Sequence, residues 1–328
     1  MSTRTVLVAG GAGFIGSHTA KLLHAGGFEP VVYDNLSTGH ASSVRWGPLV
    51  EGDVLDTELV ARTLEDYAPV AVIHFAASAY VGESVGDPAK YYSNNVGGTL
   101  SLIEACRRAG IDKVIFSSSC ATYGIPSELP IREDAPQTPI NPYGRTKLIA
   151  EHMLADYATA YGLRYVALRY FNACGADPEG ELGEAHDPET HIIPRALMAA
   201  SGRIDRLEIF GDDYATADGT CIRDYIHVTD LARAHVLALK HLMRGGTNLA
   251  VNLGTGRGTS IREILNAIHE ITGRDVPVEM RQRRAGDPPA LYADPGMARE
   301  KLGFWAQYSN LETIIRTAAP FFGLEARK

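Results

Sequence analysis

A glycine-rich turn near the N-terminus constrains the fold of this chain more than any other feature. The stretch VLVAGGAGFIGSH places Gly10, Gly13 and Gly16 between an apolar run that ends at Ala9 and a helical pattern that opens at Phe14. Glycines at these positions leave the amide groups of a helix N-terminus open to a pyrophosphate, which larger side chains would block. A tight β–α turn without a ligand has the same pattern, so the loop gains meaning only from its surroundings.

The first half of the chain alternates between strand and helix patterns. Short apolar, β-branched runs suit strands buried on both faces; they are TVLVAG, PVVYDN, PLVEGD, VAVIHFAA, KVIFSSS and RYVALRYFN. Helix-length segments separate them, at residues 14–26, 57–66, 89–109 and 144–161. This alternation predicts an α/β fold built on a doubly wound, Rossmann-type parallel sheet.

The second half follows a different pattern. The stretch RYFNACGADPEGELGEAHDPET is rich in glycine, proline and acidic residues, which marks a loop and a domain junction. Beyond it we expect strands at LEIF, RDYIHV and LAVNLG and helices at 192–201, at 230–242 with Asp230 as N-cap, and from Ser260. We predict a dinucleotide-binding domain at 1–178, with contributions from about 225–255, and a smaller, mixed α/β substrate domain at 179–328.

Composition excludes several classes of partner. The net charge of −8 argues against nucleic acid or an anionic membrane as a general partner, and no stretch of 18 uninterrupted apolar residues or signal-peptide pattern occurs. The eleven histidines show no HExxH pattern and no cysteine at ligand spacing, so no metal site is predicted. Widely spaced cysteines without a CxxC pair predict reduced thiols and a cytoplasmic location; they are Cys106, Cys120, Cys174 and Cys221.

Two aspartates follow the second and third apolar runs. Asp34 comes 18 residues after Gly16, where a carboxylate can accept hydrogen bonds from both ribose hydroxyls and would repel a 2′-phosphate. That position favours NAD over NADP. Asp53, in VEGDV, is placed either to approach the adenine or to lie in a solvated turn, and the sequence leaves both readings open.

The stretch NPYGRTK places Tyr143 four residues before Lys147, on one face of a predicted helix. A phenol with a pKa near ~10 becomes a base at neutral pH only if its pKa falls, and a nearby ammonium and an oxidised nicotinamide both lower it. In isolation, a tyrosine and a lysine at this spacing are at least as typical of the surface of an amphipathic helix as of a catalytic site. The serine cluster of VIFSSSCATYG shifts the balance, because parallel strands place ligands at their carboxyl ends. Ser119 is the best-placed hydroxyl, while Ser117 and Ser118 are predicted to form a turn.

Over almost its full length the chain resembles the extended short-chain dehydrogenase/reductase family, and within it the nucleotide-sugar 4-epimerases. The stretches that carry this resemblance are GGAGFIGSH, DN at 34–35, GD at 52–53, HFAA, VGESV, YYSNNVGGT, SSSCATYG, NPYGRTK, LRYFNACGA, GDDYATADGTCIRDYIHV, NLGTG and RRAGDPP, in the family's order. The resemblance implies that Tyr143 is the catalytic base, Lys147 its electrostatic and ribose partner, and Ser119 the third member of the triad.

The resemblance also implies the residues that bind the two ligands. For NAD they are Gly10, Gly13, Phe14, Ile15, Gly16, Asp34, Asn35, Asp53, Val54, Phe75, Ala76, Ala77, Asn94, Tyr143, Lys147 and Tyr170. For a UDP-sugar they are Ser119, Tyr143, Asn172, His191, Ile192, Phe210, Arg223, Tyr225, Arg284, Asp287 and Leu291. Arginine suits a diphosphate because its fork of donors matches phosphate oxygens. Without the resemblance, Arg281, Arg283 and Arg284 would be interpreted as a solvated basic turn, and His186 and His191 as loop residues.

The residues after Ser119 indicate which reaction follows sugar oxidation. Related dehydratases and decarboxylases carry acidic residues there, whereas Cys120 and Ala121 cannot act as general acids. We therefore expect interconversion of UDP-galactose and UDP-glucose through a 4-keto sugar, with tightly bound NAD. The alternatives are a UDP-xylose/UDP-arabinose 4-epimerase, an enzyme that accepts UDP-GlcNAc, and a noncatalytic NAD-binding protein. The resemblance also implies a homodimer.

Two positions depart from the family pattern. Ala79 stands where the family has a lysine near the cofactor pyrophosphate, so that cofactor retention is expected to rely on other groups. Leu291 aligns with the position that limits the C2 substituent of the sugar. A large aromatic residue there is associated with exclusion of N-acetylated sugars and a small one with acceptance. Leucine is intermediate in size, so we predict weak activity on UDP-GlcNAc.

Overall fold

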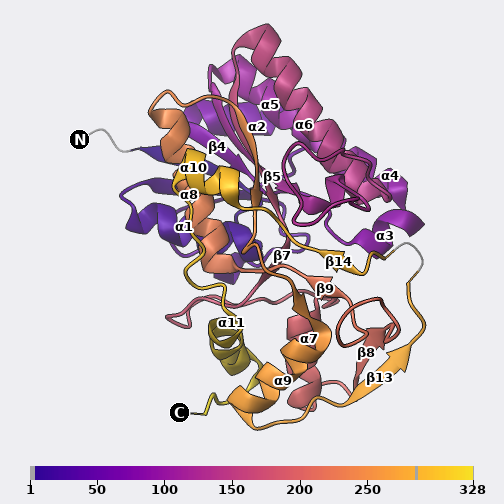
Figure 1. The fold of residues 1–328 in the computed structure, drawn as a ribbon. Coiled ribbons are helices and arrows are strands. Elements are labelled where there is room, and N and C mark those ends of the chain that lie inside the picture. Colours follow the sequence, from indigo (N-terminus) through magenta and orange to yellow (C-terminus); the bar gives the residue numbers. More distant parts are fainter. Residues whose placement is uncertain (1–3, 285–286, 328) are drawn as a thin grey trace.

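A seven-stranded, entirely parallel sheet forms the centre of the molecule (Figure 1). The structure is a computed structural model that describes residues 4–284 and 287–327. The strand order is β11-β6-β5-β4-β1-β2-β3. The strands are β1 (Thr5–Ala9), β2 (Glu29–Asp34), β3 (Leu49–Glu51), β4 (Ala71–His74), β5 (Lys113–Ser119), β6 (Arg164–Tyr170) and β11 (Leu249–Leu253). The predicted doubly wound parallel sheet is confirmed.

Helices cover both faces of this sheet, as its apolar strands require. One face packs against α1 (Phe14–Ala25), α8 (Val228–Met243) and α10 (Gly296–Leu302). The other packs against α2 (Thr57–Tyr67), α5 (Gly98–Ala109) and α6 (Pro142–Tyr161). Strand β11 of the sheet, and the helices α8 and α10 that cover it, thus come from the second half of the chain. The domain boundaries at 178 and 179 remain a prediction.

A smaller unit of mixed strands and helices lies beyond the carboxyl ends of the central strands (Figure 1). Its helices share one apolar core; they are α7 (Ile192–Ala200), α9 (Ile261–Thr272) and α11 (Leu311–Ala318). Its strands pair in three small sheets; they are β7 (Asn172–Cys174) with β10 (Tyr225–His227), β8 (Leu207–Phe210) with β13 (Val278–Arg281), and β9 (Ile222–Arg223) between β12 (Thr259–Ser260) and β14 (Ala290–Leu291). The β12–β9 pair is antiparallel and the β14–β9 pair parallel, as expected of a mixed α/β unit.

Two predicted helices differ from the structure in informative ways. The predicted helix 89–109 is divided into α4 (Pro88–Tyr91), a π-helical segment (Tyr92–Gly97) and α5, and a separate short helix, α3 (Val81–Gly86), precedes it. The prediction of Asp230 as an N-cap is wrong, because α8 begins at Val228 and His227 caps it. The Asp230 carboxylate is buried and instead accepts hydrogen bonds from the backbone of Gln307 and Tyr308.

Within residues 4–284 and 287–327, no helix combines the length and apolarity needed to cross a membrane.

Candidate active site

The glycine loop joins β1 to α1 and brings backbone close to backbone. Gly10 has φ +78°, and a Cβ there would lie 2.5 Å from the backbone nitrogen of Ala76. A Cβ on Gly16 would collide with the carbonyl oxygen of Gly10. Gly13 is the N-cap of α1 and offers no side chain, so the first-turn amides of Phe14 and the residues after it stay open. The loop therefore has the shape and the donors that a pyrophosphate requires.

The Asp34 carboxylate is held beside this loop. Its Oδ2 accepts a hydrogen bond from the Ala12 amide and its Oδ1 from the Leu36 amide, each at 2.9 Å. Burial raises the pKa of Asp34, and these two hydrogen bonds act in the opposite direction. Asn35 donates to Asp53 Oδ2 at 2.9 Å, so the ends of β2 and β3 present both residues together. Asp53 Oδ1 also accepts a hydrogen bond from the Leu55 amide at 2.9 Å, as a turn aspartate does, and the contact of Asp53 with the adenine remains a prediction.

The remaining NAD-binding candidates follow the ends of neighbouring parallel strands, which meet at one edge of the sheet. Phe75, Ala76 and Ala77 follow β4, and the amides of the first two donate to the carbonyl of Ala9, at 2.7 and 3.1 Å. Tyr170 ends β6. Ile15 lies in the first turn of α1 and Val54 follows Asp53, while Asn94 lies in the π-helical segment. The loop shape, Asp34 and this common edge together fit NAD.

Asn95, in the same π-helical segment, is a positioning residue that the sequence analysis missed. Its buried side chain accepts from the Ser78 amide at 2.8 Å and donates to the Ser78 carbonyl at 3.0 Å. It also donates to the Thr146 hydroxyl at 3.1 Å. One amide therefore fixes the segment that contains Ala79 against α6. An asparagine beside Asn94 gave no local signal of this role.

Tyr143 and Lys147 lie on the first two turns of α6, where both are buried. Asn141 caps the helix and accepts a hydrogen bond from the Gly144 amide at 2.8 Å. Lys147 Nζ donates to the carbonyl of Ser117 at 2.7 Å and lies 5.9 Å from the centre of the Tyr143 ring. The helix start is thus joined to the strand end, and the two side chains share one face of the helix, as their spacing predicted.

The electrostatics of this pair differ from the prediction. Burial raises the pKa of Tyr143; the neighbouring Tyr170 adds to this rise, and a hydrogen bond with Ser119 opposes it. Burial also lowers the pKa of Lys147 to about 7, against the opposing charge of Glu151. The prediction that Lys147 lowers the pKa of Tyr143 is therefore wrong for the side chains alone. Desolvation weakens the ammonium and the phenolate at the same time.

The two serines before Ser119 are not turn residues, contrary to the prediction. Both lie within β5 and are buried. The Ser117 hydroxyl shares a hydrogen bond of 2.5 Å with the Tyr170 hydroxyl. The Ser118 hydroxyl donates to Glu151 at 2.5 Å. Polar partners on neighbouring elements allow these hydroxyls to sit in a buried strand.

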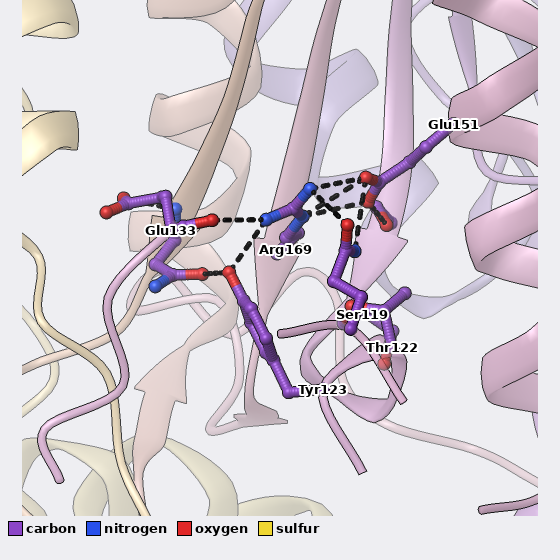
Figure 2. Close-up of polar contacts among 9 residues, drawn as sticks. Ser119, Thr122, Tyr123, Glu133, Glu151 and Arg169 are labelled. Carbon is purple, nitrogen blue, oxygen red and sulfur yellow. Dashed lines mark hydrogen bonds and ion pairs between the residues drawn. The ribbon is translucent and has the colours of Figure 1, made fainter. Parts of the chain in front are cut away.

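Ser118 leads into a buried polar network behind the triad, called here the Arg169 network (Figure 2). Arg169 donates to both carboxylate oxygens of Glu151, with the shortest contact at 2.6 Å, and to the Tyr123 hydroxyl at 2.8 Å. Tyr123 in turn donates to Asn252 at 2.7 Å. The network joins α6, β6, β11 and the end of β5. The sequence analysis missed it, although Glu151 lies one helical turn after Lys147.

On the substrate side, β9 brings a cation to the end of β5. Arg223 is ion-paired with Asp287 and lies in register with Leu291 of β14. Leu291 packs in one apolar cluster with Cys120 and Phe171. The position proposed to limit the C2 substituent therefore lies directly beside the segment that follows Ser119.

The other substrate candidates come from nearby elements. Tyr225 is in register with Asn172, whose amide donates to the Asp224 carbonyl at 3.1 Å. The guanidinium of Arg284 stacks over the Phe210 ring at 4.0 Å. His191 is the N-cap residue of α7, and Ile192 is the first residue of that helix.

The three arginines of the predicted basic turn separate into different roles. Arg281 pairs with Glu208 of β8 at 3.0 Å and is a surface residue. Arg283 stacks over the Tyr214 ring at 4.3 Å and is ion-paired with Asp213. Within this group only Arg284 has no carboxylate partner among its described contacts, which suits it to an anionic ligand.

Comparison with known proteins gives one consistent result. Residues 6–254 match the model of the NAD dependent epimerase/dehydratase family. The chain is 54% identical over 318 residues to a UDP-glucose 4-epimerase of Rhizobium leguminosarum bv. trifolii, a match that covers 97% of each chain.

Solved structures agree with these sequence matches. A UDP-glucose 4-epimerase from Brucella ovis in complex with NAD is 76% identical, with a TM-score of 0.98, and the match covers 99% of this chain and 100% of that one. A UDP-glucose 4-epimerase from Bifidobacterium longum in complex with NAD+ and UDP is 38% identical, with a TM-score of 0.91 and coverage of 96% and 97%. The predicted resemblance is confirmed.

Proposed function

This chain belongs to the NAD dependent epimerase/dehydratase family, and we propose that it interconverts UDP-galactose and UDP-glucose with Ser119, Tyr143 and Lys147 as catalytic residues. The observation that carries this proposal is the buried contact between α6 and the end of β5, at the edge of the parallel sheet where the glycine loop also lies. NAD, when bound, accepts a hydride from C4 of the sugar and returns it to the opposite face.

The chain's own residues manage the proton. Tyr143 takes the proton of the C4 hydroxyl as the carbonyl forms and gives it back in the second half of the reaction. Ser119 favours the phenolate, because its interaction with the phenol acts against the rise that burial causes in the pKa of Tyr143. Burial raises the pKa of Tyr143 in the protein itself, and the positive charge of an oxidised nicotinamide beside the phenol would favour the phenolate.

Lys147 is the second charge that sets this balance. Its Nζ is anchored to the Ser117 carbonyl, and burial lowers its pKa to about 7. A ribose hydroxyl near Nζ would stabilise the ammonium by hydrogen bonding. A ribose hydroxyl bound at Lys147 would thus favour the ammonium, and the ammonium in turn would favour the Tyr143 phenolate.

The segment after Ser119 supports epimerisation over elimination. Burial raises the pKa of the Cys120 thiol to about 12, so the thiol stays neutral and can act neither as a general acid nor, as a thiolate, as a general base. Ala121 has no titratable group. Without an acid or base at this position a 4-keto sugar can only be reduced again.

We propose that the substrate is held by its nucleotide while the oxidised sugar turns. Arg223 and Arg284 suit the diphosphate, and Asp287 suits the ribose hydroxyls. The similarity to UDP-glucose 4-epimerases favours hexose substrates over the UDP-xylose/UDP-arabinose and noncatalytic alternatives. The homodimer and the cytoplasmic location also remain proposals; the free state of all four cysteines supports the second.

The direct test is epimerisation by purified protein without added cofactor. We expect NAD to be released when the protein is denatured, and NMR to show conversion of UDP-galactose into UDP-glucose. Absence of C4 epimerisation on UDP-glucose, UDP-galactose, UDP-GlcNAc, UDP-xylose and UDP-arabinose, after full loading with NAD, would reject the proposal.

A further inference from the structure

Four ligand-type side chains converge in the loop between β7 and α7, in a group called here the Glu184 cluster. They are Glu184, His186, Glu189 and His191, spaced as E-x-H-x-x-E-x-H, and one ligand atom from each lies within 4.8 Å of all the others. His186 Nδ1 lies 3.1 Å from Glu184 Oε1 and 3.5 Å from Glu189 Oε2. His191 Nδ1 lies 2.7 Å from Glu184 Oε1 and 3.2 Å from Glu189 Oε1.

These contacts are short, but two of the atoms involved are not hydrogen-bonded. Glu184 Oε1 and His186 Nδ1 are fully buried and have no hydrogen-bond partner among the described residues. The Glu184 side chain is only 3% exposed. A hydrogen bond needs its N–H to point at the acceptor, so distance alone does not satisfy these atoms. We interpret these close atoms, which form no hydrogen bond with the described residues, as ligand atoms that surround one common point at the centre of the cluster.

The distances also match a metal centre. Bonds of about 2.0–2.2 Å to nitrogen and oxygen in a tetrahedron place neighbouring ligand atoms about 3.4 Å apart. The four histidine-to-carboxylate separations range from 2.7 to 3.5 Å. With both imidazoles neutral, as metal ligands require, the two carboxylates leave a charge of −2, which a divalent cation neutralises. Imidazole with carboxylate favours zinc among such cations.

Surrounding groups hold the ligands in place, as outer-shell partners of metal sites do. Glu189 Oε1 accepts hydrogen bonds from the amides of Thr190 and His191, at 2.7 and 2.8 Å. The His186 ring packs edge-on against Phe14, with ring centres 6.1 Å apart. Phe14 is the first residue of α1, so the cluster lies against the helix that opens at the glycine loop.

A second acidic group nearby shows the contrast. Asp177, Glu179 and Glu181 also converge, but Lys21 Nζ is ion-paired with all three, at 2.8, 2.8 and 2.6 Å. A lysine ammonium already occupies the centre that a cation would take. In the Glu184 cluster the groups that face the carboxylates are the two imidazoles, which are charged only when protonated and bind a metal when neutral.

We propose that Glu184, His186, Glu189 and His191 form a tetrahedral site for a divalent transition metal, zinc foremost. The bound metal ties the loop before α7 to α1 and fixes the ring of His191 at the start of α7. This inference goes beyond the proposed function and does not depend on it. The site is structural in that all four positions around the metal come from the chain.

Metal content of the NAD-loaded full-length protein tests the proposal. The protein is stripped with a chelator, reloaded with zinc chloride, freed of excess metal by gel filtration and analysed by mass spectrometry of the elements. We expect about one zinc per chain. Reloading with cobalt(II) should give the intense visible absorption of tetrahedral cobalt. Less than about a tenth of a zinc per chain, or binding of magnesium and calcium in preference to zinc, would overturn the assignment.

Matched variants locate the metal. Glu184→Gln and His186→Ala should each lower zinc retention at least tenfold, with NAD content and circular dichroism as checks on folding. Glu179→Gln, in the group paired with Lys21, and His152→Ala, an exposed histidine of α6, should retain zinc. Equal zinc in all four variants would place the metal elsewhere and overturn the proposal. If His186→Ala fails to fold, Glu184→Gln carries the decision, because it changes one oxygen to an amide at nearly constant volume.

Discussion

Two buried groups of charged side chains lie near the proposed active site, and they are satisfied in different ways. In the Arg169 network, Arg169 and Glu151 form several hydrogen bonds with each other, and Tyr123 and Asn252 complete the set. In the Glu184 cluster the charged atoms are equally close, yet Glu184 Oε1 has no hydrogen-bond partner among the described residues.

The difference follows from where the side chains come from. The network is built on α6, β6, β11 and the end of β5, which are rigid elements that fix each donor opposite its acceptor. A fully satisfied buried network makes a structure more rigid, whereas an incomplete one is costly unless a ligand completes it. The comparison teaches that a short distance between charged atoms does not establish a hydrogen bond. The donor must also point at its acceptor.

The largest effect is expected at the site that the Arg169 network supports. Tyr143→Phe removes the proton acceptor and keeps the ring, so activity should fall by about 10²–10⁴-fold while bound NAD persists. Turnover of UDP-galactose and NAD released on denaturation are the two measurements. A variant that kept more than a tenth of wild-type turnover would show that Tyr143 is not the base.

The network itself is tested by removing one partner. Arg169→Met leaves the Glu151 carboxylate buried and unpaired, which should cost about 3–5 kcal/mol in the free energy of unfolding. The double variant Glu151→Leu/Arg169→Met removes both charges and should recover most of this loss. Urea titration measures all three proteins. Equal stability of the single and double variants would show that the charges are not coupled.

The Glu184 cluster should respond in a different way. For protein stripped of metal, Glu184→Gln should lower the free energy of unfolding less than Arg169→Met does, because among the described residues Glu184 faces only His186 and His191 and accepts no arginine fork. Zinc should raise the melting temperature of the wild type and leave that of the variant unchanged. A destabilisation of the stripped variant as large as that of Arg169→Met would abolish the contrast between the two groups.

Lys147 connects the network to the triad and gives a pH prediction. Burial lowers its pKa from 10.5 to about 7 in the folded protein, so between these values the unfolded chain binds more protons. The free energy of unfolding of NAD-free protein should therefore rise with pH across this window and lose the contribution as pH falls through 7. Lys147→Met should lack this rise in urea titrations at pH 6, 7.5 and 9. Parallel pH profiles of the two proteins would contradict it.

The smallest effect is expected outside both groups, at Leu291. Leu291→Cys opens space beside Cys120 without changing any charge. It should raise the rate on UDP-GlcNAc, relative to UDP-glucose, by about tenfold or less. Initial rates on the two substrates measure this ratio. No gain on UDP-GlcNAc would show that the residue limiting the C2 substituent lies elsewhere.

Much of the site could be predicted because its signals are local. The glycine loop, Asp34 at the end of β2 and the four-residue spacing of Tyr143 and Lys147 each express a rule that operates within one or two elements. The parallel sheet then brings the strand ends together. The predicted turn role of Ser117 and Ser118 was wrong because their partners, Tyr170 and Glu151, lie on other elements.

The sequence by itself determined the fold class, the preference for NAD and the pairing of Tyr143 with Lys147, since backbone geometry and helix periodicity set these at short range. Only the tertiary structure decided the protonation behaviour of Tyr143 and Lys147, because burial outweighs the pairwise attraction that spacing suggests. The tertiary structure also decided which group of charged side chains has hydrogen-bond partners for its buried atoms. The direction of a donor toward its acceptor depends on how distant elements pack, and the sequence alone does not contain that angle.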